Sequence, residues 1–170
     1  MATMESLMRN RFFMIKEFEN YGINIYGQVK NYTTGRILKS QMNNRGYYVI
    51  DLYIKSKRTH KLIHQLLAEL FIPNPSNKQY IDHIDRNSAN NKLSNLRWCT
   101  ISENNQNMSK RSDNKSGITG VTFCNIYKKW HVRIHINGNK KHIGYFRDKE
   151  EATHARNEAE ILYFGEFRRE

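Results

Sequence analysis

The stretch from Tyr80 to Asn107 reads YIDHIDRNSANNKLSNLRWCTISENNQN and gathers carboxylates, a histidine and many asparagines in one short segment. An imidazole beside a carboxylate places a base next to a hard oxygen ligand. Asparagines in loops, however, usually cap helices and form turns without any further role. Spacing therefore leaves two interpretations, a polar connecting loop or part of a hydrolytic site, and the rest of the chain has to decide between them.

The charge of the whole chain indicates a polyanionic partner. Lysine and arginine total 28 of the 170 residues against 16 aspartates and glutamates, which gives a formal net charge of +12. Such an excess is typical of proteins that bind nucleic acid, although net charge alone identifies no ligand. The two cysteines form no CxxC pair, so a disulfide framework or a cysteine zinc finger is not predicted. No apolar run reaches the length of a membrane span, and we expect a cytoplasmic protein without membrane contact.

Hydrolysis of a phosphodiester needs a base for water, a cation for the developing charge, and groups that orient both. His83 has a side chain suited to the base, and Asp82 beside it offers a carboxylate ligand for Mg²⁺. The amide oxygen of Asn104 would add a second ligand. An asparagine carbonyl, with Asn95 as the candidate, would fix the ring of His83 by accepting a hydrogen bond.

This segment resembles the HNH homing endonucleases of phages and other mobile elements. The matching residues are Asp82-His83, Asn90-Asn91, Asn95-Leu96-Arg97-Trp98 and Glu103-Asn104-Asn105. The resemblance implies a ββα-metal fold with two short strands and a helix. It also implies that His83 is the general base, that Asn95 orients it, and that Asp82 and Asn104 hold one Mg²⁺ or Mn²⁺ per site.

Several positions within the resemblance stay open. An asparagine stands where many relatives have a final histidine, so Asn104 and Asn105 both remain candidates for the last ligand. Arg97 is expected either to contact phosphate or to pair with Asp85. Leu96 and Trp98 are interpreted as packing residues.

The residues upstream predict a small β-rich unit followed by a helix. Residues 21–60 contain three strand-like runs, INIYGQVKN, GRILKS and RGYYVIDLYI, separated by turns at 32–35 and 43–46. The spacing of apolar residues in HKLIHQLLAELF predicts a helix over 60–71 that prolines end. These parts resemble the NUMOD-type unit and the helix that precede the HNH motif. His64 in this helix is either a buried structural side chain or a candidate for a role at the phosphate.

Downstream, the sequence predicts a linker at 109–117 and then a separate module. Alternation in KWHVRIHI, the Asn137-Gly138 turn signal and the earlier GVTFCN run predict three antiparallel strands. Helical spacing in DKEEATHARNEAEILYFGEF predicts one amphipathic helix over one sheet face, whose apolar positions are Ala152, Ala155, Ala159, Leu162 and Tyr163. The module resembles the plant AP2/ERF DNA-binding domain, in which such a sheet enters the major groove.

The face of this sheet away from the helix is predicted to contact DNA. Between Lys115 and Arg147 there are seven lysines and arginines and no acidic residue. Arg133 and His135 are the expected base readers, and lysines would contact phosphates. A basic sheet also suits RNA, but the pattern places no aromatic pair on the exposed face, which disfavours that alternative. The predicted outward positions are Thr122, Cys124, Lys129, His131, Arg133, His135, Lys140 and His142.

Together these features predict an α+β protein in four parts: a β-rich unit over 1–59, an HNH nuclease over 60–108, the linker, and the DNA-binding module over 118–170. The predicted function is site-specific cleavage of double-stranded DNA with a divalent metal and no other cofactor, by a monomer that nicks or a dimer that cuts both strands. The alternative is a DNA-binding regulator of the same fold that lacks catalysis.

Overall fold

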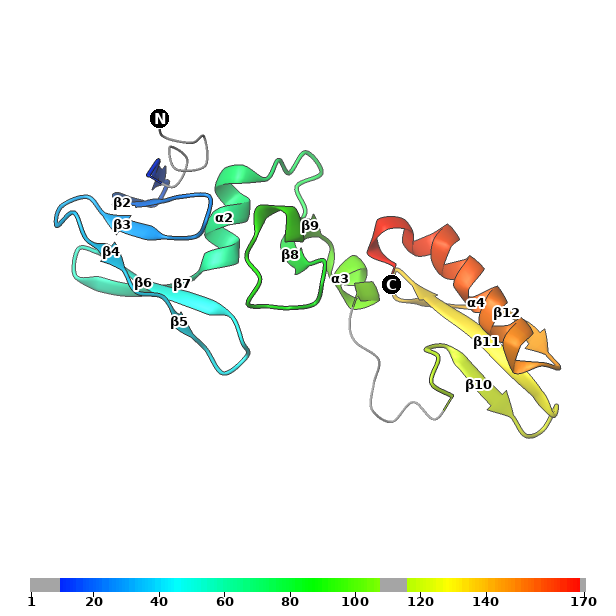
Figure 1. The fold of residues 1–170 in the computed structure, drawn as a ribbon. Coiled ribbons are helices and arrows are strands. Elements are labelled where there is room, and N and C mark those ends of the chain that lie inside the picture. The colour runs from blue at the N-terminus through cyan, green and yellow to red at the C-terminus, as the bar shows by residue number, and fades with distance from the viewer. Residues whose placement is uncertain (1–9, 108–115, 169–170) are drawn as a thin grey trace, which may run out of the picture. The chain divides into compact units, whose positions relative to one another are not determined.

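The computed structural model describes residues 10–107 and 116–168, and the chain divides into two compact units, Met1–Cys99 and Thr100–Glu170 (Figure 1). Both are built from antiparallel strands and helices, which confirms the predicted α+β class. Most of the linker predicted over 109–117, namely residues 109–115, lies outside the described residues. Among the described helices, none is long and apolar enough to cross a membrane.

The first unit begins with a four-stranded antiparallel sheet in the order β1-β2-β3-β4. The run INIYGQVKN, predicted as one strand, is divided between two of these strands. The cause is the buried side chain of Asn24, whose oxygen accepts hydrogen bonds from the backbone amides of Tyr26 and Gln28 and so closes a turn. The strands are β1 (Phe13–Ile15), β2 (Phe18–Ile23), β3 (Val29–Asn31) and β4 (Ile37–Leu38).

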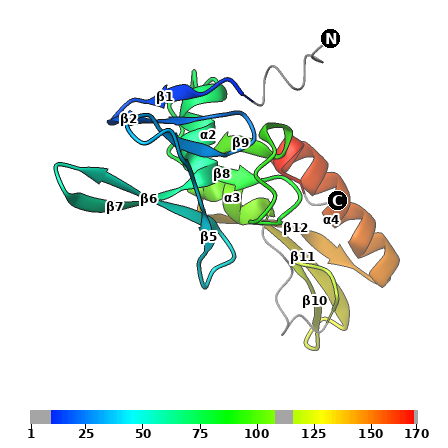
Figure 2. The ribbon, with the colours of Figure 1, turned by 60° about the vertical axis from the view of Figure 1, so that its left-hand side comes forward.

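A second sheet follows, made of β5 (Gln41–Met42), β6 (Tyr48–Ile54) and β7 (Lys57–Leu62). Figure 2 shows the long hairpin that β6 and β7 form. The predicted helix over 60–71 starts later, as α2 (Ile63–Phe71). Its first predicted turn is instead the end of β7, because the ladder with β6 runs from Ile54 opposite Lys57 to Val49 opposite Leu62.

The core of the first unit lies where α2 meets the strands. Leu66 and Leu67 of α2 pack in one buried cluster with Ile23, Leu52 and Leu96. The predicted packing role of Leu96 is confirmed, whereas Trp98 forms a hydrogen bond. Leu96 is buried, whereas the half-buried Trp98 donates from Nε1 to the Ile72 carbonyl oxygen at 2.9 Å. These contacts fix the segment after α2 against the hairpin described next.

That hairpin consists of β8 (Tyr80–His83) and β9 (Leu96–Cys99), which pair antiparallel. A loop and the short 3₁₀ helix η1 (Leu93–Asn95) connect them. The helix α3 (Ile101–Asn107) follows β9 along the chain and belongs to the second unit. Thr100 and Glu103 form a capping box at its start, because the Glu103 side chain accepts from the Thr100 amide and the Thr100 hydroxyl accepts from the Glu103 amide.

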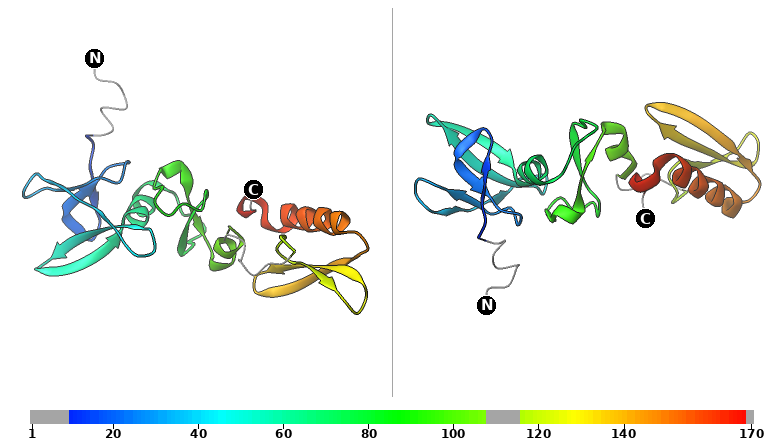
Figure 3. Two further views of the ribbon diagram at one scale, coloured as in Figure 1. Left: turned by 60° about the horizontal axis from the view of Figure 1, so that its bottom comes forward. Right: turned by 90° about the horizontal axis from the view of Figure 1, so that it is seen from above.

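The predicted three-stranded sheet of the second unit is present. Its strands are β10 (Val121–Cys124), β11 (Lys129–Ile136) and β12 (Asn139–Phe146), in that order. The helix α4 (Lys149–Phe164) runs along one side of this sheet (Figure 3) and ends in the 3₁₀ helix η2 (Gly165–Phe167). The Asp148 side chain caps α4 by accepting from the Glu150 amide at 2.7 Å.

The buried stripe of α4 differs from the predicted one. Ala152 and Ala159 pack against Val132 and Ile134 as expected, but Leu162 is 73% exposed. The turn between the two alanines carries the buried Arg156, whose Nε donates to the Thr119 carbonyl oxygen at 2.7 Å. The prediction from apolar spacing left Arg156 out of the buried stripe, because spacing of apolar residues cannot identify a buried arginine that anchors a loop.

Candidate active site

Asp82 and His83 are the last two residues of β8, and both are buried, with 5% and 6% of their surfaces exposed. Asp82 lies opposite Arg97 in the ladder with β9. The Nε and Nη2 atoms of Arg97 both donate to Asp82 Oδ2, at 2.9 and 2.7 Å. The expectation that Arg97 pairs with Asp85 is therefore wrong, because antiparallel pairing places it across from Asp82.

Asp85 instead organises the loop after β8, together with Asn95. The Asn95 amide nitrogen donates to Asp85 Oδ1 at 2.9 Å and to the Asn90 carbonyl oxygen at 2.8 Å, and its amide oxygen accepts from the Asp85 backbone. Burial acts to raise the pKa of Asp85, but the hydrogen bonds from Asn90, Asn87 and Asn95 outweigh it and the pKa is lowered. Both polar atoms of the Asn95 side chain are thus used to hold the loop.

Asn91, and not the predicted Asn95, is the asparagine whose side-chain oxygen contacts the His83 ring. Its Oδ1 atom is 3.0 Å from His83 Nε2. An amide oxygen accepts from an N–H, so this contact fits the tautomer that carries its proton on Nε2 and leaves Nδ1 as the basic atom. Sequence reasoning missed this role, although Asn91 belongs to the Asn90-Asn91 pair in the matching pattern.

His64 lies in the same site. Its ring on α2 meets the ring of His83 edge to face, with 4.9 Å between centroids, and Tyr47 contacts both rings. Burial, and next the nearby His83, lower the pKa of His64 to about 4. His64 is therefore neutral at neutral pH and contacts the candidate base through an uncharged ring.

Asn104 and Asn105 both lie on α3, in the second unit, and Asn104 is the less exposed of the two. A carboxylate and an amide are hard oxygen donors, and this donor chemistry fits Mg²⁺ or Mn²⁺ rather than a soft ion. In the described parts of the chain, no three histidine, cysteine, aspartate or glutamate side chains form a group that could hold a metal ion by themselves. A cation at Asp82 would therefore need oxygens from amides, water or phosphate.

On the second unit, the register confirms which side chains share the face away from α4. Thr122 and Tyr145 flank His131, His142 pairs with Arg133, and Lys140 pairs with His135. Their neighbours Val132 and Ile134 point to the helix side and are buried. Cys124 and Lys129 pair at the outer end of β10 and β11. The predicted outward residues thus lie together on one face.

Tyr145 is an aromatic residue on this face that the sequence pattern did not predict. A bulge between Val132 and Arg133 breaks strict alternation on β12, so His142 and Tyr145 point to the same side. The Tyr145 ring stacks on His131 with 4.8 Å between centroids, and His131 Nε2 is 2.9 Å from His142 Nδ1. Burial, then His142 and Arg133, lower the pKa of His131. The open face thus carries one aromatic ring that the sequence did not predict, beside histidines and not as part of the aromatic pair considered for RNA.

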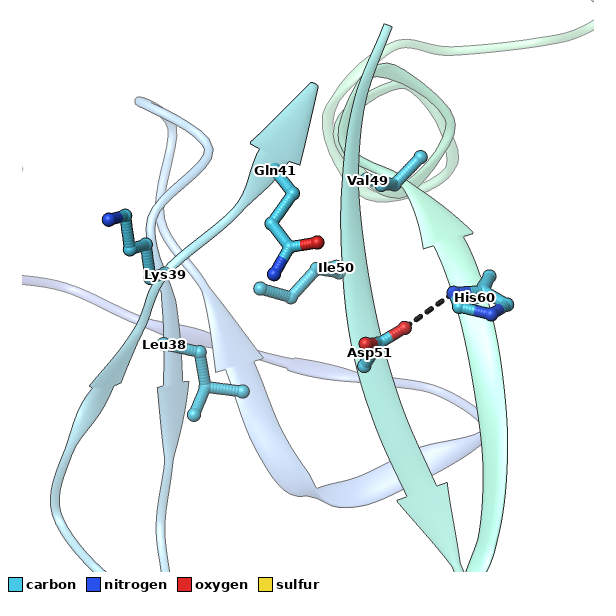
Figure 4. Close-up of a pocket in the computed structure, with 7 residues that line it drawn as sticks. All are labelled: Leu38, Lys39, Gln41, Val49, Ile50, Asp51 and His60. Carbon is cyan, nitrogen blue, oxygen red and sulfur yellow. Dashed lines mark ion pairs between the residues drawn. The ribbon is translucent and has the colours of Figure 1, made fainter. Parts of the chain in front are cut away.

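A separate cavity of about 230 Å³ lies in the first unit, lined by residues from Leu38 to His60 (Figure 4). Its polar wall is an ion pair between Asp51 of β6 and His60 of β7, which are cross-strand partners. The hydrogen bond from Arg58 lowers the pKa of Asp51. None of the residues predicted for catalysis lines this cavity, so the candidate active site remains the β8–β9 hairpin.

A hairpin whose first strand ends in a buried Asp-His pair, followed by a helix, has the element order of a ββα-metal nuclease module. Comparison with known families agrees: residues 61–106 match the model described as HNH endonuclease, and residues 12–53 match the NUMOD4 motif. Residues 61–106 are thus similar to HNH endonucleases, and residues 12–53 are similar to the NUMOD4 motif.

Individual relatives point in the same direction. The chain is 41% identical over 95 residues to the uncharacterized HNH endonuclease L247 of Acanthamoeba polyphaga mimivirus, covering 53% of this chain and 23% of the relative. It is 34% identical over 98 residues to the DNA endonuclease I-HmuI of Bacillus phage SP01, covering 57% and 56%. The chain thus spans less than two thirds of the length of these relatives.

A solved structure shares the fold. The structure described as DNA binding and cleavage by the HNH homing endonuclease I-HmuI superposes with a TM-score of 0.56 at 24% identity, covering 89% of each chain. At this identity the likeness establishes the common fold, and the activity has to be argued from the site.

Proposed function

We propose that this chain is a homing-type HNH endonuclease that hydrolyses phosphodiester bonds of double-stranded DNA. The observation that carries the proposal is the buried Asp82-His83 pair at the end of β8, in which Asn91 holds one ring nitrogen of His83. The HNH endonuclease match over residues 61–106 and the net charge of +12 support it. A phage or other mobile element is the source that the relatives suggest, with action inside a host cell.

The catalytic steps follow from the surroundings of His83. In the tautomer whose Nε2–H donates a hydrogen bond to Asn91 Oδ1, the Nδ1 atom is the basic nitrogen and can remove a proton from an attacking water. The neutral His64 ring against it adds no competing charge at neutral pH. Asn95 keeps the loop after β8 in place through Asp85, so we assign it an indirect part in orienting His83.

Asp82 and Asn104 are the residues we propose to hold the divalent cation, Mg²⁺ or Mn²⁺, one per site. When bound, this ion stabilises charge that develops on the phosphate and the departing oxygen. Asp82 provides a carboxylate that β8 and Arg97 keep in one orientation. Asn104 provides a neutral oxygen from α3, and Asn105 is the alternative on the same helix.

The second unit would supply sequence recognition. We propose that β10, β11 and β12 contact the major groove as in AP2/ERF domains, with Arg133 and His135 reading bases and Lys129 and Lys140 contacting phosphates. The open-face arrangement of these side chains supports it. The proposed parts remain the β-rich unit over 1–59, the nuclease over 60–108, the linker, and the DNA-binding module over 118–170. Joining a DNA-binding module to a nuclease lengthens the recognised DNA site, as cleavage at rare sites requires.

Incubation with long duplex DNA and Mg²⁺ tests the activity. The wild type is expected to produce discrete fragments, while His83→Ala and EDTA abolish them. His154→Ala is the matched histidine control and should cleave like the wild type, because His154 is exposed on α4, where it lies beside Glu158 one turn further along the helix. Equal duplex binding without cleavage by every protein would instead establish a non-catalytic regulator. Tighter binding to single-stranded RNA than to duplex would overturn the DNA assignment.

A further inference from the structure

We propose that Arg97 makes divalent-metal binding at Asp82 depend on bound DNA, so that the free protein binds the ion weakly and the protein–DNA complex binds it tightly. The inference rests on the proposed role of Asp82 as metal ligand. It assigns Arg97 to the positioning and charge balance of that ligand.

The contact is specific and buried. Both Nε and Nη2 of Arg97 donate to the same carboxylate oxygen, Oδ2, and only 13% and 6% of the two side chains are exposed. The β8–β9 ladder places the two residues directly opposite each other, so the pair is held by the backbone of the hairpin. A buried pair is screened by salt far less than a surface pair.

The Arg97 guanidinium therefore sets a positive charge against the Asp82 carboxylate before any ligand arrives. A guanidinium stays charged at every accessible pH, so this positive charge is permanent. A divalent ion at Asp82 meets repulsion from Arg97, which at roughly 5 Å and water-like screening lowers affinity about tenfold or more. Phosphate oxygens of DNA supply the missing negative charge.

The neighbouring Asp85 shows that the fold can hold an aspartate without a cation. Its carboxylate accepts from the amides of Asn90 and Asn95 and from the Asn87 backbone, all of them neutral donors. Three residues apart, one aspartate accepts from neutral donors and the other is paired with a charged arginine. Orientation alone does not require the arginine, which points to a role for its charge.

The first test measures Mn²⁺ binding to the DNA-free protein by electron paramagnetic resonance of the unbound ion. Arg97→Gln, which removes the charge, should bind Mn²⁺ about tenfold more tightly than the wild type. Arg97→Lys keeps the positive charge but loses the paired Nε and Nη2 donors, and its Mn²⁺ affinity should stay within about twofold of the wild-type affinity. The double variant Asp82→Asn/Arg97→Gln should not show this increase in Mn²⁺ affinity. Equal affinities of the wild type and Arg97→Gln, with circular dichroism showing both folded, would overturn the proposal.

The second test needs no change at Arg97 and so covers the case in which Arg97→Gln fails to fold. His83→Ala, which is expected not to cleave, is titrated with Mn²⁺ in the presence and in the absence of duplex. The double variant His83→Ala/Asp82→Asn is titrated in the same way, and its Mn²⁺ binding, which includes the ions bound by the DNA itself, is subtracted. The duplex should tighten the Asp82-dependent site about tenfold or more. Tight binding without duplex would overturn the inference. Neither readout requires cleavage, so a protein that cleaves nothing yet shows both effects contradicts only the proposed function.

Discussion

His64 and His83 are two buried imidazoles in ring contact, and their surroundings separate their roles. His83 has an amide oxygen at Nε2, whereas burial lowers the pKa of His64 to about 4. A ring that stays neutral at pH 7 cannot act as a cation at the phosphate. The structure therefore favours a packing role for His64, in which it supports the ring of the candidate base.

The lowered pKa of His64 predicts a pH dependence of stability. Its ordinary value is 6.5, so the unfolded chain takes up a proton between pH 6.5 and about 4 while the folded chain does not. Protonation then favours unfolding, and the stability present above pH 6.5 falls across this window by up to roughly 3 kcal/mol. His64→Phe keeps a flat ring without a titrating group and should flatten the profile.

The measurement is the urea midpoint of the first unit between pH 7 and pH 4, followed by Trp98 fluorescence in a Trp130→Phe background. His154→Ala removes an exposed histidine and serves as the control, which should keep the wild-type slope. A His64→Phe profile as steep as that of the wild type would contradict the assignment of the proton to His64.

At the scale of elements, sequence patterns located the strands and helices better than the contacts between them. Alternation in β11 and the Asn137-Gly138 turn predicted the β11–β12 hairpin, and the structure confirms it. The bulge at Val132 was not predictable, because a bulge changes pairing without changing the local apolar pattern. It brings Tyr145 onto the open face beside His131.

A glycine beside this bulge gives a test of the element. Gly120 has a φ of +80°, and a Cβ there would collide with the Arg133 carbonyl oxygen and lie 2.8 Å from Arg156 Nε. Gly120→Ala should therefore lower the free energy of unfolding of the second unit by about 2–4 kcal/mol. Gly138 has the same φ but no neighbour within 4 Å, so Gly138→Ala should cost only about 1 kcal/mol.

Urea denaturation followed by Trp130 fluorescence, in a Trp98→Phe background, measures both variants. The comparison separates the cost of a left-handed backbone, which both positions share, from the cost of the close approach at Gly120. Equal losses in the two variants would show that the loop before β10 can move away from β11 and Arg156.

At the scale of the whole molecule, the net charge of +12 is useful only where the fold exposes it. Lys140 and Lys141 are adjacent in sequence and point to opposite sides of β12. Lys140 lies opposite His135 on the open face, whereas Lys141 lies opposite Ile134 and donates from Nζ to the Tyr163 hydroxyl at 2.6 Å. Their contributions to DNA binding should therefore differ.

We expect Lys140→Ala to weaken duplex binding and to reduce the slope of log affinity against log salt by about one, because one phosphate contact is lost. Lys141→Ala, the matched control, should keep the wild-type slope. Fluorescence anisotropy with a labelled mixed-sequence duplex at about 50–200 mM salt measures both. A larger loss for Lys141→Ala would place the DNA on the other side of the sheet.

The sequence by itself determined the α+β class and the outward face of the last sheet, and its resemblance to HNH endonucleases implied the two strands that carry Asp82, His83 and Asn95. Periodicity, turn residues and motif spacing are local properties, so they can be read along the chain. Which side chains meet was decided only by the tertiary structure. Strand register placed Arg97 on Asp82, a turn of the loop placed Asn91 on His83, and packing of α2 placed His64 against the same ring. These contacts join residues far apart in sequence, and only the pairing and packing of whole elements fixes them.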